Sequence, residues 1–156
     1  EEVFSHFRFL GTFPIDFQEV IPEVLVELKR LKRDKQTHQL GMILNLDTHD
    51  QPGSHWVALF IDLQKKTFEY FDSFADKTPQ EVIDFHARHF PAFKLLENNI
   101  AHQRENNECG NYSINFLVQR MSGRTFKEVT QDVIHDSEMN KKRKEFFDPR
   151  DPYDNF

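Results

Sequence analysis

A β-hairpin is the most clearly patterned element of this 156-residue chain. Residues 55–63 form a nearly unbroken apolar run, residues 64–66 are polar, and residues 67–72 mix aromatic with polar side chains. A short apolar run indicates a buried strand, and a second run after a short polar turn indicates a returning strand. The hairpin therefore predicts a sheet that has His55 and Asp72 at the same end.

Helical and extended segments flank the hairpin. Pro22 precedes an apolar stripe with helical spacing at Val24, Leu28 and Leu31, and residues 40–46 favour a further strand. The chain therefore predicts an α+β fold in one domain that spans residues 1–156. Because it begins with Glu-Glu rather than Met, an additional N-terminal region remains an open expectation.

Three short patterns predict where helices begin. Asp16 with Glu19 and Thr125 with Glu128 resemble capping boxes. Thr78 precedes a proline and has a glutamate three positions after it, which indicates another N-cap. The apolar face expected after Thr78 consists of Ile83, Ala87 and Phe90.

The composition excludes some classes of function. No apolar run approaches the roughly 20 residues that span a bilayer, and no secretory signal is visible, so we expect no membrane partner. The net charge of −6 argues against general nucleic-acid binding. Two basic runs, at residues 29–35 and 141–144, are most simply exposed helix faces, with binding of a polyanion as the alternative.

The chain has one cysteine, Cys109, so it cannot form an internal disulfide and requires no oxidising compartment. Cys109 lies at the predicted start of an apolar helix that runs to Met121. Free N–H groups and the helix dipole at such a position favour an anion, which lowers the pKa of a thiol. Gly110 leaves room for a substrate backbone. A buried structural cysteine is the alternative.

Three other residues complete a possible nucleophilic site. A thiolate needs a base or an imidazolium partner, and His55 is the best placed of eight histidines, at the mouth of a strand. Asp72 can orient that histidine. Gln103 precedes Cys109 by six residues and can stabilise an oxyanion. Taken singly, each residue also fits an ordinary structural role.

Together these residues resemble the adenovirus protease and SUMO protease superfamily of cysteine peptidases. The resemblance is carried by His55-Trp56, Phe71-Asp72-Ser73, and Gln103 followed by Glu108-Cys109-Gly110. Further segments resemble the proteases of large nucleocytoplasmic DNA viruses, such as that of African swine fever virus. These segments are residues 11–17, 45–47, 52–56, 70–73 and 136–140, with Arg143 and Phe146-Phe147.

The resemblance implies a papain-like core in permuted order, with a central mixed sheet packed by the helix that carries Cys109. It implies a thiol peptidase with a His-Asp-Cys triad of His55, Asp72 and Cys109, and an oxyanion donor in Gln103. The residues expected to contact substrate are Ser54, Trp56, Glu108 and Gly110. SUMO proteases usually hold a di-glycine between two tryptophans, whereas this chain has only Trp56.

The expected function is cleavage of viral structural polyproteins at Gly-Gly-type sites during virion maturation. The alternatives are a deubiquitinase or a SUMO or NEDD8 deconjugase with the same site, and a catalytically inactive binding module. The expected partner is a polypeptide with small residues before the scissile bond, such as a viral polyprotein or a ubiquitin-like protein.

No cofactor and no metal is expected, and DNA or a peptide as an activator at residues 29–33 is a secondary alternative. The expected location is the virion and the virus factory in the host cytoplasm for a viral protein, and otherwise a reducing intracellular compartment.

Overall fold

The computed structural model describes residues 5–53, 55–104 and 109–146. Its strands are β1 (Phe7–Pro14), β2 (Gln39–Asn45), β3 (Trp56–Asp62), β4 (Thr67–Phe71) and β5 (Lys94–Glu97). Its helices are α1 (Phe17–Val20), α2 (Pro22–Arg33), α3 (Gln80–His89), α4 (Cys109–Met121), α5 (Phe126–Gln131) and α6 (Asp136–Phe146).

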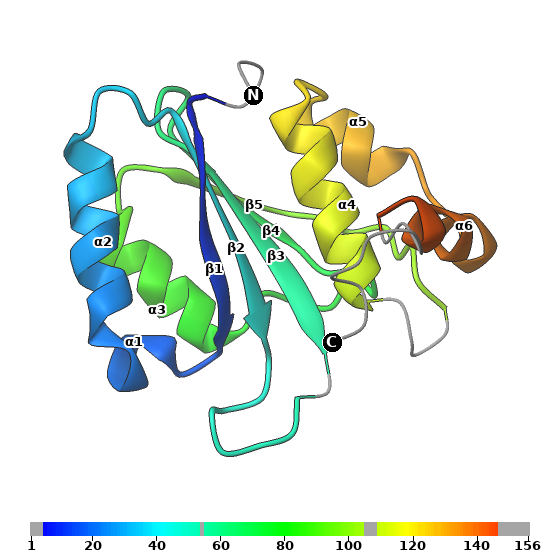
Figure 1. The fold of residues 1–156 in the computed structure, drawn as a ribbon, viewed down its shortest axis with the longest axis horizontal. Helices are drawn as coiled ribbons and strands as arrows, with labels where there is room; N and C mark the ends of the chain where they lie inside the picture. The colour runs from blue at the N-terminus through cyan, green and yellow to red at the C-terminus, as the bar shows by residue number, and fades with distance from the viewer. Residues whose placement is uncertain (1–4, 54, 105–108, 147–156) are drawn as a thin grey trace, which may run out of the picture.

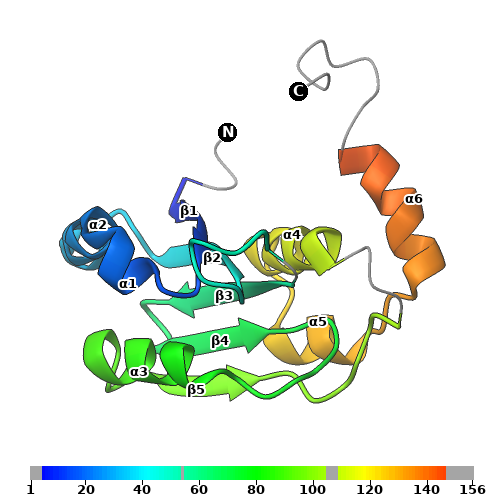
Figure 2. The same ribbon diagram turned by 90° about the horizontal axis from the view of Figure 1, so that it is seen from below.

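The strands form one mixed sheet in the order β1-β2-β3-β4-β5. The three central strands are antiparallel neighbours, and the two outer pairs, β1 with β2 and β4 with β5, are parallel. Parallel neighbours require a crossover connection, which α1 and α2 provide at one edge and α3 at the other. Helices cover both faces, with α1–α3 on one side and α4–α6 on the other (Figures 1 and 2).

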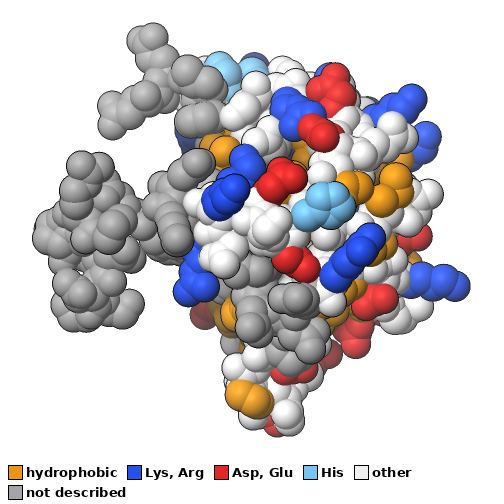
Figure 3. Space-filling model, turned by 90° about the vertical axis from the view of Figure 1, so that its right-hand side faces the viewer, with side chains coloured by type: hydrophobic (Ala, Val, Ile, Leu, Met, Phe, Trp, Pro, Cys, Tyr) orange, Lys and Arg blue, Asp and Glu red, His pale blue; other side chains and the backbone are white. Residues whose placement is uncertain are grey.

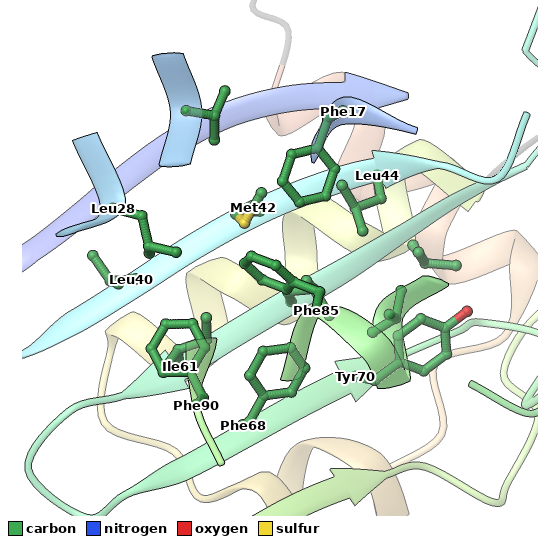
Figure 4. Packing of buried hydrophobic residues seen from close by; sticks show 14 of the residues in the cluster. Phe17, Leu28, Leu40, Met42, Leu44, Ile61, Phe68, Tyr70, Phe85 and Phe90 are labelled. Carbon is green, nitrogen blue, oxygen red and sulfur yellow. The ribbon is translucent and has the colours of Figure 1, made fainter. Parts of the chain in front are cut away.

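The larger core lies between the sheet and helices α1–α3. Phe17 of α1 packs edge-on against Phe85 of α3, and Phe68 of β4 contacts both Phe85 and Phe90 (Figure 4). Aromatic rings of this size bury a large area each and account for the heavy use of phenylalanine. This core holds the two crossovers against the sheet.

The second core joins α4 to the opposite face of the sheet. Phe71 of β4 stacks on Phe116 of α4, with ring centroids 4.6 Å apart. Arg120 of α4 makes a two-pronged ion pair with Glu69 of β4, at 2.7 and 2.8 Å, and lies 4.5 Å above the Phe60 ring. These contacts fix the helix that begins at Cys109, so the expected α+β architecture with this helix against a mixed sheet is confirmed.

Long-range contacts overturn two of the expected side-chain caps, although helices begin at or next to both places. Asp16 precedes α1, but its carboxylate makes no cap and instead accepts hydrogen bonds from the backbone and ring of His49. Thr78 does not cap α3, because its hydroxyl donates to Glu97, and Pro79 occupies the N-cap position. The capping box of Thr125 and Glu128 before α5 is confirmed.

One predicted apolar face differs in part from the structure, and one helix was not predicted. In α3 the buried residues are Val82 and Phe85, whereas Ile83 and Ala87 are exposed; Phe90, just after the helix, is buried as expected. The sequence interpretation did not identify α6, whose residues are mostly polar and whose buried anchor is Met139. Each of these helices is positioned by one or two large side chains rather than by a continuous stripe.

The surface over α4–α6 carries acidic and basic side chains that are interspersed rather than gathered by sign (Figure 3). In α2 the basic side chains of residues 29, 30, 32 and 33 are exposed, while Leu28 and Leu31 are buried. Across the described part of the chain, no helix is both long enough and apolar enough to cross a membrane.

We predict that Glu69→Leu destabilises the fold by about 3–5 kcal/mol, because it leaves the Arg120 guanidinium buried without its partner. Denaturant unfolding followed by fluorescence measures the change. Glu27→Gln breaks an exposed Arg–Glu pair within α2 and is the matched control, with little expected change in midpoint. Equal stability of the two variants would show that the buried pair does not anchor α4.

Candidate active site

Three side chains from separate elements meet beside the start of α4. His55 immediately precedes β3, Asp72 immediately follows β4, and Cys109 is the first residue of α4. Nε2 of His55 lies 2.8 Å from Oδ1 of Asp72, and the same ring hydrogen-bonds the Cys109 thiol. Because the carboxylate takes Nε2, Nδ1 is the ring nitrogen that is left for the sulfur.

The strand register explains why His55 and Asp72 meet. β3 and β4 pair with Ala58 opposite Phe71, so the chain arrives at both residues at the same end of the sheet. On the other side of β3, the backbone N–H of Leu46 donates to the His55 carbonyl at 2.9 Å and extends the pairing with β2. The hairpin therefore determines the spacing of the imidazole and the carboxylate.

Asp72 is fully buried, and hydrogen bonds to both its backbone and its side chain hold it in place. The Asn98 amide accepts a hydrogen bond from the Asp72 N–H at 2.9 Å and donates one to the Asp72 carbonyl at 2.7 Å. Oδ1 of Asp72 also accepts from the Phe74 N–H at 2.8 Å. Asn98 is the residue after β5. Its side-chain amide pairs with the Asp72 backbone where the backbone hydrogen bonds between β4 and β5 end.

Electrostatics favour a proton on His55 and a negative charge on Cys109. Burial lowers the pKa of His55, but its hydrogen bonds to Asp72 and Cys109 and their charges outweigh burial and raise that pKa to about 9. Burial raises the pKa of the Cys109 thiol, but His55 and the backbone N–H groups of Trp56 and Gly110 bring the net pKa below its ordinary value. The arrangement stabilises an imidazolium–thiolate pair.

The first turn of α4 is fastened to the start of β3. The Ser113 hydroxyl lies 2.9 Å from the Cys109 carbonyl oxygen and 3.2 Å from that of Trp56. Among the residues that the structure describes, none outside the neighbouring backbone lies within 4 Å of a side chain added at Gly110.

Gln103 is tied to the residue after Asp72. The backbone N–H groups of His102 and Gln103 both donate to the Ser73 carbonyl, and the Ser73 hydroxyl donates to Oε1 of Gln103 at 2.6 Å. Because Oε1 is the acceptor in this bond, the other end of the amide is the donor nitrogen. Gln103 is buried, and its donor end is therefore oriented by Ser73.

Trp56, the residue after His55, also lines a hollow of about 460 Å³. The hollow is formed where β1 and β2 end, and it is lined by Thr12, Phe13, Pro14, Val20, Ile21, Asn45, Thr48, His49, Gln51 and Trp56. Pro14, Asn45 and Trp56 lie in register on three adjacent strands. Trp56 packs against the core beneath α4, whereas Phe13 packs against the core on the opposite face of the sheet.

The loop that carries His55 is anchored beside this hollow. His49 and Asp16 form an ion pair at 2.5 Å, and the Ile15 N–H donates to the Asp47 carbonyl at 3.2 Å. Gly53 has a φ of +87°, and a side chain there would collide with the Asn45 amide. Glycine is therefore required at this turn.

Two expected substrate contacts, Ser54 and Glu108, lie outside the described residues. Asn98 and Ser113 were not singled out from the sequence, since nothing local distinguishes Asn98 from Asn99 or Ser113 from another helix residue. Within residues 5–53, 55–104 and 109–146, no group of three or more His, Cys, Asp and Glu side chains could hold a metal ion.

Comparisons with known proteins identify the family of this chain. Residues 32–152 match the C-terminal catalytic domain of the Ulp1 protease family. A protein of Acanthamoeba polyphaga mimivirus that is assigned as a thiol protease is 30% identical over 157 residues, which cover 94% of this chain and 52% of the relative.

The cysteine protease S273R of African swine fever virus is 34% identical over 132 residues, which cover 78% of this chain and 48% of that protein. A crystal structure of the protease from this virus matches with a TM-score of 0.67 and 25% identity, over 85% of this chain and 56% of that one. The chain thus spans about half the length of the curated relatives it matches.

A more distant match is the Ulp1 protease domain in complex with Smt3, the yeast ortholog of SUMO. It has a TM-score of 0.51 and 19% identity over 77% of this chain and 63% of that one, and it shows a shared fold. The expected protease-type architecture is confirmed by these matches.

We predict that Cys109 is alkylated rapidly at pH 7. The midpoint of its alkylation rate against pH should lie below the ordinary pKa of a thiol. Removing His55 removes the charge that lowers the thiol pKa, so His55→Ala moves the midpoint upward. Each pKa unit of that shift costs about tenfold in thiolate at pH 7. Iodoacetamide labelling followed by intact mass measures the rate, and His135→Ala, at an exposed histidine, is the control. An unmoved midpoint in His55→Ala would contradict the ion pair.

We also predict that Asn98→Ala destabilises the fold by about 2–3 kcal/mol, since it leaves a buried N–H and a buried carbonyl of Asp72 without partners. The adjacent Asn99→Ala changes an exposed side chain and is the matched control. Thermal unfolding compares the two variants. Equal melting temperatures would mean that Asn98 does not hold Asp72.

Proposed function

Because this chain belongs to the Ulp1 protease family, a family of cysteine peptidases, we propose that Cys109, His55 and Asp72 form its catalytic triad. The observation that carries the proposal is the imidazole of His55, which hydrogen-bonds a buried carboxylate through Nε2 and also interacts with the only cysteine of the chain. A nucleophile, its base and a group that orients the base are the parts that acyl transfer requires.

The proposed reaction proceeds through a covalent acyl-enzyme. The Cys109 thiolate attacks the carbonyl carbon of the scissile bond, and the carbonyl oxygen takes the negative charge. As the tetrahedral intermediate collapses, the His55 imidazolium gives its proton to the leaving amine, and a thioester remains. Water then attacks the thioester, with His55 taking one proton of the water, and the acid product leaves.

In this mechanism Gln103 stabilises the oxyanion. Its side-chain amide is turned by the Ser73 hydroxyl so that oxygen faces Ser73 and nitrogen faces the other way. A buried amide donor that is already oriented loses little on binding the transition state, and one such donor contributes about 10²–10³ in kcat.

Trp56, the residue after His55, is the proposed cover of the channel for the residues before the scissile bond. An indole beside that channel favours glycine, because glycine presents no side chain to the ring. Phe13 packs against the core on the opposite face of the sheet, so it does not replace the second tryptophan of SUMO proteases.

We propose Gly-Gly-type sites in viral structural polyproteins as the substrates, cleaved during particle maturation in the virion and the virus factory. The support is the similarity to proteases of two large DNA viruses, together with the position of Trp56 directly after His55.

We predict that Cys109→Ala lowers peptide cleavage by more than about a thousandfold, and Gln103→Ala by about a hundredfold or more. A Gly-Gly-Xaa peptide library and C-terminal electrophile probes of ubiquitin, SUMO and NEDD8 provide the readouts. Gln103→Ala should keep the wild-type alkylation profile of Cys109, because its side chain is placed to act on the oxyanion.

The outcomes separate the possible functions. Cleavage of Gly-Gly peptides without a modifier adduct supports a maturation protease. An adduct at Cys109 with one modifier replaces that function with deconjugation. A Cys109 that reacts neither with probes nor with iodoacetamide at pH 7 refutes catalysis and favours a binding module.

A further inference from the structure

One carboxylate outside the catalytic cluster contacts both segments that carry proposed catalytic groups. Oδ2 of Asp136 accepts a hydrogen bond from the backbone N–H of Arg104 at 3.0 Å. Oδ1 of the same residue lies 2.9 Å from the Tyr112 hydroxyl, which donates to it. Arg104 is the residue after Gln103, and Tyr112 lies one helical turn after Cys109.

The Tyr112 end of this bridge is rigid. Tyr112 is buried in α4, and its hydroxyl also lies 2.7 Å from the Ile134 carbonyl and 3.3 Å from the His102 carbonyl. The hydroxyl has one proton, so these oxygens share it rather than each accepting a full hydrogen bond, and the burial of the ring in α4 keeps the hydroxyl among them. The first turn of α4 is thereby fixed relative to the segment before α6.

The Gln103 end is held by the residue that precedes it. His102 is buried, its Nε2 donates to the Thr130 carbonyl at 2.9 Å, and its ring packs edge-on against Phe71. Asp136 then fixes the chain on the other side of Gln103, at Arg104. The oxyanion donor is thus anchored on both sides.

Asp136 itself is placed by the docking of α6. It is the first residue of that helix, and Met139, one turn later, is fully buried in the core between the sheet and α4. Figure 2 shows α6 beyond α5 on the side of the molecule that α4 covers. The position of this carboxylate therefore depends on a side chain three residues away.

We propose that Asp136 is a positioning residue of the peptidase, whose carboxylate sets the distance between the Gln103 amide and the Cys109 thiol. The proposal rests on the function proposed above. Oxyanion donors act only when they lie within hydrogen-bond reach of the developing charge, so a small displacement costs rate rather than substrate binding. The thiolate itself depends on His55, Trp56 and Gly110, which Asp136 does not contact in the described bonds.

The test compares Asp136→Ala, Asp136→Asn and Tyr112→Phe with the wild-type chain. For a peptide that the wild type cleaves, we expect Asp136→Ala to lower kcat by about 10- to 100-fold, with KM within about twofold and an unchanged pH profile of Cys109 alkylation. Asp136→Asn keeps the shape and one acceptor oxygen, so it should restore part of the loss. Tyr112→Phe removes the hydroxyl alone and should show a smaller loss in kcat.

Asp132→Asn is the matched control. Asp132 is an exposed carboxylate four residues earlier, and it pairs with Arg124 rather than with either catalytic segment. We expect its kcat and KM to equal those of the wild type.

A second readout does not depend on peptidase activity. Amide hydrogen exchange at Arg104, measured by NMR, should be slow in the wild type and in Asp132→Asn, and at least about tenfold faster in Asp136→Ala. If no peptide is cleaved by the wild type, the proposed function fails, and this measurement alone decides whether Asp136 holds the segment.

Three results would overturn the proposal. They are an unchanged kcat in Asp136→Ala, a shift in its alkylation profile as large as that of His55→Ala, and unchanged exchange at Arg104. A general loss of structure would appear as a lower melting temperature in Asp136→Ala and Asp136→Asn alike, without rescue of kcat by asparagine, and it would also count against positioning.

Discussion

Ala58 of β3 lies opposite Phe71 of β4, and the remaining structure depends on this register. Both faces of β4 are buried, with Phe71 and Glu69 toward α4 and Phe68 toward α3. A slip of one residue would turn each of these side chains to the opposite face and place a carboxylate among aromatic rings. The stack and the ion pair that hold α4 on the sheet therefore also hold Asp72 beside His55.

A buried charge is expensive unless its surroundings compensate for it, and the site meets this cost in two ways. Asp72 receives hydrogen bonds from a backbone N–H and from an imidazole, while Asn98 completes its backbone. The thiolate form of Cys109 accepts hydrogen bonds from the backbone N–H groups of Trp56 and Gly110, and it faces the His55 imidazolium. Each charge thus faces donors that folding has already placed, which keeps reorganisation small when charge moves during a reaction.

Local patterns predicted the elements whose signals are local. The hairpin follows from run lengths between residues 55 and 72, and the helix at Cys109 follows from its apolar spacing. The predictions that failed concern side chains whose partners lie far away in the sequence. Asp16 has the pattern of a capping residue, yet His49 takes its carboxylate, and Thr78 is taken in the same way by Glu97. α6 carries too little apolar character for periodicity to reveal it, because the tertiary contact of one methionine replaces an apolar stripe.

The site residues divide in the same way. Residue types and spacing suggested the histidine, the aspartate and the cysteine, the family resemblance of their motifs singled them out, and the structure brings them together. The supporting residues Asn98 and Ser113 were not found, since a hydrogen bond to a backbone group leaves no pattern along the chain.

The single cysteine has a chemical consequence for the folded protein. A thiolate of lowered pKa is the form that peroxide oxidises, and its first product is a sulfenic acid. A second thiol in the same chain often traps that acid as a disulfide, from which a reductant regenerates the enzyme. These 156 residues contain no second thiol, so a thiol that recovers oxidised Cys109 comes from outside them and must reach a residue that is only 7% exposed. Oxidation beyond the sulfenic acid is irreversible, and the working lifetime of the site is then set by the redox balance of its surroundings.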